Sequence, residues 1–135
     1  MKGFVGDIEK LTEGNADFRR VLYTAKHLQL VLMTLPPGEQ IGEEIHADRD
    51  QFFRVEQGEG EIWIDGTATR VEDGMAMTVP AGARHNVKCT GRAPLKLYTI
   101  YAPPEHVDGT VHATKLAAET SEEHFDGKDH SVTGE

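Results

Sequence analysis

Glycine and proline residues divide this chain into short segments, and this punctuation constrains its fold more than any other feature. Between the turn residues lie segments rich in β-branched and large apolar side chains, which is typical of strands. These segments are residues 19–26, 28–35, 51–57, 61–65, 67–71, 75–79, 82–89 and 94–102. Asp65-Gly66 is a strong signal for a two-residue hairpin. The spacing predicts an all-β barrel or sandwich, with short helical segments near residues 7–11 and 113–123.

The length of 135 residues predicts a single domain with one sizeable core. We expect the strands to occupy residues 19–102, after an N-terminal segment over residues 1–18. Residues 103–124 form a C-terminal extension with a possible helix. Residues 125–135 are polar and are predicted to be disordered.

The charge balance limits the classes of partner. With histidines neutral the net charge is −9, which argues against nucleic acid or an anionic membrane surface, because both attract Lys and Arg patches. The single cysteine, Cys89, excludes an internal disulfide framework and suits a reducing compartment. The first residues contain no apolar region typical of a signal peptide, so we expect a cytoplasmic protein.

Alternation along the strands predicts which side chains face the interior. In residues 51–57 the charged Arg54 and Glu56 share one face, so the other face should point inward. The same reasoning places Trp63 on the outside. The side chains expected inside are Gln51, Phe53, Val55, Gln57, Ile62, Ile64, Met75, Met77, Val79, Leu95, Leu97, Thr99 and Tyr101.

Four residues with metal-binding side chains stand at the ends of these strands. Glu44 and His46 are two apart, so in a strand they project to the same face. Gln51 starts the inward face of the next strand, and His85 follows a turn. Carboxylate, imidazole and amide groups can all hold a divalent ion, although each residue alone is more often solvated or structural.

The glycine and proline framework around these residues carries a resemblance. From Gly38 the chain reads G-x5-E-x-H-x4-Q-x6-G, and from Gly74 it reads G-x5-P-x-G-x2-H. These patterns resemble the two motifs of the cupin superfamily, G-x5-H-x-H-x3–4-E-x6-G and G-x5-P-x-G-x2-H-x3-N. The positions at the family's offsets are Gly38, His46, Gly58, Gly74, Pro80, Gly82 and His85. The resemblance covers residues 28–101. It implies a double-stranded β-helix, or jelly roll, like small single-domain cupins described as mannose-6-phosphate isomerase-like.

Three positions depart from the family pattern. Glu44 stands in place of the first metal histidine, Gln51 in place of the usual glutamate, and Cys89 in place of asparagine. The first two changes keep the formal charge of the ligand set. The resemblance therefore implies a site for one divalent ion, held by Glu44, His46, Gln51 and His85. Asp50 is a rival for Gln51, but alternation turns it to the other face unless the strand has a bulge.

The function classes stay open at this point. The ligand set suits zinc, manganese, iron or nickel. The resemblance implies a metal-dependent enzyme with isomerase- or lyase-like proton transfer on a small polar molecule, such as a sugar, a sugar phosphate or a keto acid. A redox-active metal would instead allow dioxygenase chemistry. The alternative is a ligand-binding or sensory module without turnover.

Tyr101 and the extension add candidates around this site. Tyr101 is predicted to present its phenol near the metal as an acid, base or orienting group, or else to be a core tyrosine. Arg84 could hold an anion, but alternation favours a surface position. The extension carries His106 and His112, and it can fold over the mouth of the barrel or pack along the outside.

Residues 28–35 are apolar on both faces, so a second cover is expected over the outer face of this strand. The outward Trp63 and the frequent pairing of cupins through their sheets favour a homodimer. The N-terminal segment, with Phe4, Val5, Ile8 and Leu11, is the alternative cover.

Overall fold

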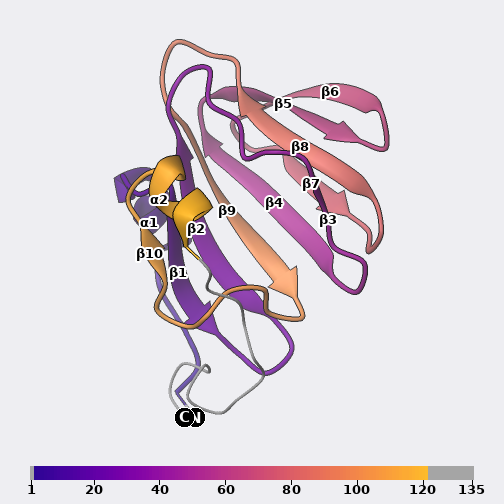
Figure 1. Cartoon of the computed structure of the whole chain (residues 1–135). Helices are drawn as coiled ribbons and strands as arrows, with labels where there is room; N and C mark the ends of the chain where they lie inside the picture. The colour runs from indigo at the N-terminus through magenta and orange to yellow at the C-terminus, as the bar shows by residue number, and fades with distance from the viewer. Residues whose placement is uncertain (1, 122–135) are drawn as a thin grey trace.

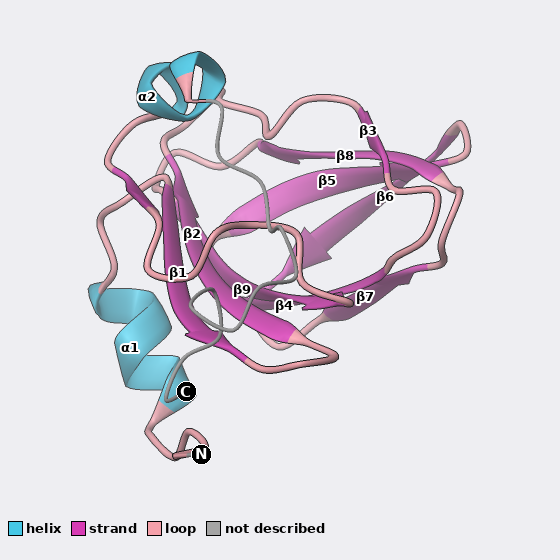
Figure 2. Cartoon of the chain, turned by 60° about the horizontal axis from the view of Figure 1, so that its bottom comes forward, coloured by secondary structure: helices cyan, strands magenta, loops and turns pink. Residues whose placement is uncertain are grey.

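Two antiparallel sheets face each other in the computed structural model, which describes residues 2–121 (Figures 1 and 2). The first has the order β10-β1-β2-β9-β4-β7 and the second the order β3-β8-β5-β6. Strands β1 to β5 are Arg19–Thr24, Gln29–Leu35, Glu44–Ile45, Asp50–Gln57 and Glu59–Ile64. Strands β6 to β10 are Thr67–Glu72, Ala76–Val79, Arg84–Cys89, Leu95–Ala102 and Val111–His112. The all-β jelly roll is confirmed, but over residues 2–121 its two sheets do not close into one hydrogen-bonded barrel.

The predicted strands are present, with ends that differ by one or two residues. The predicted helical segments correspond to α1 (Ile8–Gly14) and α2 (Lys115–Thr120). Strands β3 and β10 were not predicted, because two residues are too few to show an alternating pattern. The predicted disorder of residues 125–135 lies outside the described residues.

Two turns show why glycine is required at particular places. Asp65 and Gly66 have φ of 46° and 84°, which makes the predicted hairpin between β5 and β6 with positive φ at both central positions. Gly58 has φ of 101°, and a Cβ atom built on it would lie 2.6 Å from the carbonyl oxygen of Pro94. Gly58 is therefore held by the close approach of β9 as well as by its backbone angle.

The interior between the sheets is largely the one that alternation predicted. Most of the side chains expected inside are buried, including Gln51, Thr99 and Tyr101, while Ile64 is half-buried. Two expectations are wrong. Gln57 is exposed because the pairing of β4 with β9 shifts register between Val55 and Gln57. Met75 is exposed because it lies in the turn before β7, where strand alternation does not apply.

The outer face of β2 is covered by the N-terminal segment of the same chain. Helix α1 contacts β2, β4 and β9, and Leu32 and Thr34 of β2 are buried in this single chain. The hydroxyl of Thr34 donates to the carbonyl of Asn15 at 2.8 Å, and the amide of Asn15 donates to the same hydroxyl at 3.2 Å. Of the two covers considered for this strand, the N-terminal segment is the one present, through α1 and Asn15. The expectation that Phe4, Val5 and Leu11 pack there is wrong, because these side chains are exposed. The homodimer stays a prediction that the single chain does not test.

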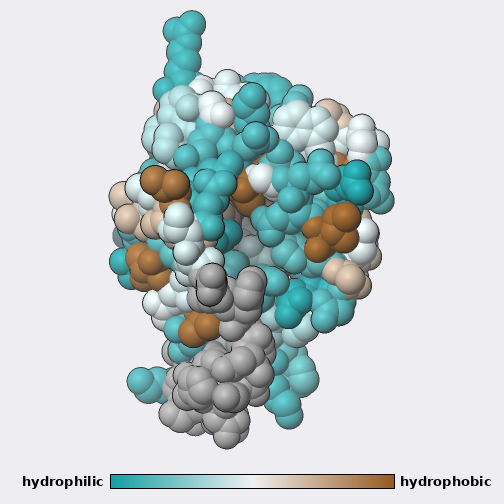
Figure 3. Space-filling model, in the orientation of Figure 1, coloured by the Kyte–Doolittle hydropathy of each residue, from teal (hydrophilic) through white to brown (hydrophobic). Residues whose placement is uncertain are grey.

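The surface seen in Figure 3 is mainly hydrophilic, with separate hydrophobic patches. Large apolar side chains that are exposed, such as Val5, Ile45 and Leu116, lie far apart in the sequence. Among residues 2–121, no helix has the length and apolar character needed to cross a membrane.

We expect Gly58→Ala to lower the free energy of unfolding by roughly 2–4 kcal/mol, because it combines backbone strain with a clash against Pro94. Gly66→Ala is the matched control: its φ of 84° is also positive, but nothing lies within 4 Å of the added Cβ. It should cost only about 1 kcal/mol. Urea unfolding measures both, and equal losses would show that the contact with β9 is unimportant.

Candidate metal centre

The four predicted ligands come together at one end of the space between the sheets. Glu44 of β3 is paired with His85 of β8. His46 follows β3, and its Nε2 lies 3.1 Å from Oε2 of Glu44. Gln51 belongs to β4 in the other sheet, and its Oε1 lies 3.0 Å from Nε2 of His85. The rings of His46 and His85 are 5.4 Å apart, so the two polar pairs are neighbours.

The contact between Gln51 and His85 joins two atoms that both tend to accept hydrogen bonds. Nδ1 of His85 lies 3.1 Å from the carbonyl oxygen of Ala83, which only accepts, so Nδ1 carries the proton. Nε2 of a neutral His85 then presents a lone pair. The side-chain amide of Gln51 donates to the hydroxyl of Thr99 at 3.0 Å, which leaves its oxygen facing His85. A cation bound by both Oε1 of Gln51 and Nε2 of His85 would relieve this repulsion. A second proton on His85, or exchange of the nitrogen and oxygen of the Gln51 amide, would have the same effect.

The other pair, Glu44 and His46, consists of an acid and a base, and each favours the charged form of the other. Burial alone would raise the pKa of Glu44, but the contact with His46 and smaller contributions from Arg19 and His85 lower this pKa below its ordinary value. Burial alone would lower the pKa of His46, but Glu44, and then Glu105, raise it. Nε2 of His46 is buried, and its contact with Glu44 lacks the geometry of a hydrogen bond. Such a nitrogen is a suitable donor for a metal once its proton has left.

Asp50 is outside the site. Its side chain is exposed, and its carboxylate accepts a hydrogen bond from the backbone N–H of Ala81 at 2.9 Å. Gln51, the next residue, is 3 % exposed and points between the sheets. The prediction from strand alternation, with Gln51 facing inward and Asp50 facing outward, is therefore confirmed.

A ready-made metal cluster is not part of the arrangement. Within residues 2–121 no three His, Cys, Asp or Glu side chains are grouped in a way that could hold a metal ion. The donors instead form two pairs, one of which contains the amide of Gln51. Their chemistry nevertheless fits a divalent ion, because the two neighbouring pairs together offer one carboxylate, one amide oxygen and two imidazoles.

Tyr101 lies beside these pairs. It is 1 % exposed, and its ring stands edge-on to those of His46 and His106 at 5.7 Å and 5.1 Å. Burial, followed by the nearby charge of Glu44, raises the pKa of Tyr101 far above its ordinary value. The phenol is therefore protonated at neutral pH, so it can donate a hydrogen bond or a proton but is a poor base.

The C-terminal extension lies over this end of the sheets. The side chain of Gln29 donates to the carbonyl of His106 at 2.7 Å and accepts from the backbone N–H groups of His106 and Glu105 at 2.9 Å and 3.2 Å. Arg49 donates to the carbonyl of Pro104 at 3.0 Å. These contacts bring His106 to the site. His112 lies in β10, which pairs with β1 at the edge of the sheet.

Sequence reasoning missed four residues around the site, namely Arg19, Gln29, Arg49 and Glu105. Gln29 was a detectable signal, because a polar residue in the otherwise apolar segment 28–35 needs buried partners. Arg84 is exposed and pairs with Glu43 at 3.1 Å, as the surface interpretation expected.

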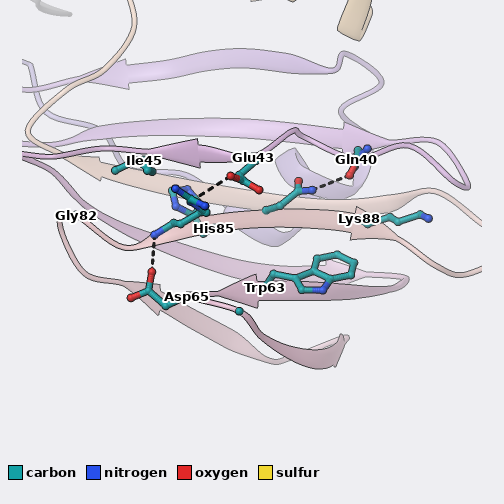
Figure 4. A pocket seen from close by; sticks show the side chains of 11 residues that line it. Gln40, Glu43, Ile45, Trp63, Asp65, Gly82, His85 and Lys88 are labelled. Carbon is teal, nitrogen blue, oxygen red and sulfur yellow. Dashed lines mark hydrogen bonds and ion pairs between the residues drawn. The ribbon is translucent and has the colours of Figure 1, made fainter.

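A pocket of about 390 Å³ opens next to the donors. Its lining includes Phe18, Arg19, Glu44, His46, Glu105 and Lys115. A larger hollow of about 820 Å³ lies around Trp63 and Lys88 on β5 and β8, and His85 also belongs to its lining (Figure 4). Several polar groups there already pair with each other, such as Asn86 with Gln40 at 2.6 Å. The smaller pocket is therefore the better candidate for chemistry, because it is the one that borders Glu44 and His46.

The electrostatics predict a pH window for the metal-free protein. The lowered pKa of Glu44 stabilises the fold above about pH 4.5, and this contribution is lost as the pH falls through the folded-state pKa. The raised pKa of His46 stabilises the fold below about pH 6.5, and this contribution is lost as the pH rises through the folded-state pKa. After chelation, the difference in Tm between wild type and His46→Asn should be largest between these values. His27→Asn, at an exposed turn, is the control. A difference that is constant from pH 4 to 9 would contradict the pairing.

Comparison with known proteins identifies the family. A cupin domain model matches residues 31–101. The chain is 48% identical to the uncharacterized protein YrkC of Bacillus subtilis over 90% of this chain and 69% of that protein. It is 40% identical to the uncharacterized protein L612 of Acanthamoeba polyphaga mimivirus over 80% of this chain and 70% of that protein. The crystal structure of BH2720 from Bacillus halodurans matches with a TM-score of 0.88 and 48% identity, over 89% of this chain and 96% of that one. With two sheets in the jelly-roll arrangement and the glycine and proline framework of both sequence motifs in place, this chain belongs to the cupin superfamily, as a small cupin with a single cupin domain.

Proposed function

We propose that this cupin is a metal-dependent enzyme that moves a proton on a small polar organic molecule, in an isomerase- or lyase-like reaction. One divalent ion, zinc, manganese, iron or nickel, would be held by Glu44, His46, Gln51 and His85. The observation that carries the proposal is the meeting of these four donors from both sheets beside a buried, protonated phenol. The proposed substrate classes are sugars, sugar phosphates and keto acids.

The chain supplies distinct roles in this proposal. When bound, the ion would polarise a carbonyl or enolate oxygen of the substrate. Tyr101 would donate a hydrogen bond or a proton to an oxygen of the same molecule, because its phenol stays protonated. The segment around Glu105 and His106, fixed by Gln29, would exclude water from the reacting atoms.

A second candidate is a binding or sensory cupin without turnover. It is favoured by the separation of the donors into two pairs, with no compact group of three His, Cys, Asp or Glu among residues 2–121. Bound iron or another redox-active metal would favour dioxygenase chemistry instead. The mannose-6-phosphate isomerase-like description is an analogy at the level of the fold.

The cellular context belongs to the same proposal. We place the protein in the cytoplasm, which is supported by the single, unpaired Cys89 and by the absence of a spanning helix in the described part. We also propose a homodimer. The outer surface of β5 around the half-buried Trp63 is the better candidate for its interface, since α1 covers the outer face of β2.

Metal titration of chelated protein tests the ligand set. Glu44→Gln removes the only carboxylate among the four donors, so it should weaken metal binding by about 10- to 100-fold. Asp50→Asn removes an equal charge on the outside and should leave metal affinity within about twofold. Equal effects of the two variants would refute the charge argument. Wild-type protein that holds no divalent ion by elemental analysis would favour the binding module.

Light scattering at micromolar concentration tests the dimer. We expect twice the chain mass and protection of Trp63 fluorescence from a small polar quencher, because burial of an aromatic side chain is typical of interfaces. Trp63→Ser should shift the mass toward that of one chain. A monomeric mass for wild type, with Trp63 freely quenched, would overturn the proposal.

A further inference from the structure

Arg19 is a buried cation that the proposed chemistry does not use. It starts β1, is 8 % exposed, and lines the pocket that contains Glu44 and His46. Buried arginines are almost always paired with an acid, because desolvating a charge costs several kcal/mol. In the described part of the chain, no carboxylate oxygen lies within 4 Å of the Arg19 guanidinium, and its buried Nε has no hydrogen-bond partner.

The contacts of Arg19 fix its position without neutralising it. One terminal nitrogen, Nη1, lies 3.4 Å from Nδ1 of His112, and the guanidinium carbon lies 5.3 Å from the centre of the Phe18 ring. Because Arg19 and His112 are paired across β1 and β10, the extension helps to orient this side chain. The charge of Arg19 is nevertheless felt at the site, where it lowers the pKa of Glu44.

We propose that Arg19 binds a carboxylate group of the ligand, so that the substrate of this site is a small carboxylic acid. The inference rests on the proposed function, since another oxygen of the same acid would reach the ion held by Glu44, His46 and the other two donors. A guanidinium fork matches the two oxygens of a carboxylate, and a buried Nε without a partner is the donor left to complete that fork.

The charges around the pocket favour a carboxylate over a phosphate ester. Its lining contains four acids, Glu43, Glu44, Glu105 and Glu119, against the cations Arg19 and Lys115 and the imidazoles of His46 and His106. A phosphate ester brings nearly two negative charges into this acidic surrounding, whereas a carboxylate brings one.

Calorimetric binding of pyruvate, its uncharged methyl ester and dihydroxyacetone phosphate to the metal-loaded full chain tests the proposal. Pyruvate serves as the carboxylate probe, and its methyl ester as the matched uncharged molecule. We expect pyruvate to bind wild type at least about tenfold more tightly than methyl pyruvate, and Arg19→Gln to remove this preference. Arg19→Lys keeps the charge but loses the fork, so it should lie between the two. Arg20→Gln is the matched control, because Arg20 is exposed and pairs with Asp17 at 3.1 Å.

The outcomes separate the two proposals. Metal affinity that is unchanged in Arg19→Gln, with pyruvate binding lost, supports both. Pyruvate binding that depends on Arg19 in a protein without metal keeps this inference and refutes the metal-dependent function. Three results would overturn the inference: equal binding of pyruvate to wild type and Arg19→Gln, tighter Arg19-dependent binding of the phosphate ester, or no binding of pyruvate at millimolar concentration. If Arg19→Gln fails to fold in thermal unfolding, the comparison of Arg19→Lys with Arg20→Gln decides.

Discussion

Two sheets that are not joined by a ladder of backbone hydrogen bonds, over residues 2–121, must be held together by the side chains between them. Most of this interior is apolar and tightly closed, as the complete burial of Val55, Val87 and Leu97 shows. Apolar contact of this kind is favourable but has no direction. Near the site, polar side chains take its place. Gln51 of one sheet and His85 of the other meet at 3.0 Å, and a cation or a proton between these two atoms would join the sheets. A change in the relative position of the two sheets would therefore also change the geometry of the site, because Gln51 and His85 come from different sheets.

Polar groups at this end are expensive to bury. Gln51, His85 and Arg19 are each less than 9 % exposed, and a buried polar group without a partner costs roughly 1–3 kcal/mol. An apolar set of the same volume would stabilise the fold more. The sites where the chain departs from the most stable arrangement are thus the sites where a ligand could supply the missing partners. The fold tolerates the cost of burying these polar groups because the same strands also bury apolar side chains, which stabilise it.

Much of this organisation could be predicted from the sequence. Strand alternation separated Gln51 from Asp50, and the glycine and proline spacing located His46 and His85. The failures at Gln57 and Met75 have a local cause, a register shift and a turn, which alternation cannot show.

The contact partners of Arg19 and Gln29 could not be predicted for a different reason. Arg19 contacts His112 across 93 positions of the chain, and Gln29 contacts His106 across 77. Periodicity reports which face a side chain occupies, but it does not report which distant segment meets that face. The short β10, which brings His112 to Arg19, carries no pattern of its own. Residues whose role depends on such long-range contacts can be identified only from a structure that shows where the C-terminal extension lies.

The side chain of Gln29 has a consequence for access to the site. This one amide makes three hydrogen bonds to the backbone at Glu105 and His106, and a fourth to the hydroxyl of Thr24 at 2.9 Å. Because the three bonds share a single rigid plane, a rotation of that amide breaks them together. The positions of Glu105 and His106 beside the pocket therefore depend on the orientation of a single side chain of β2.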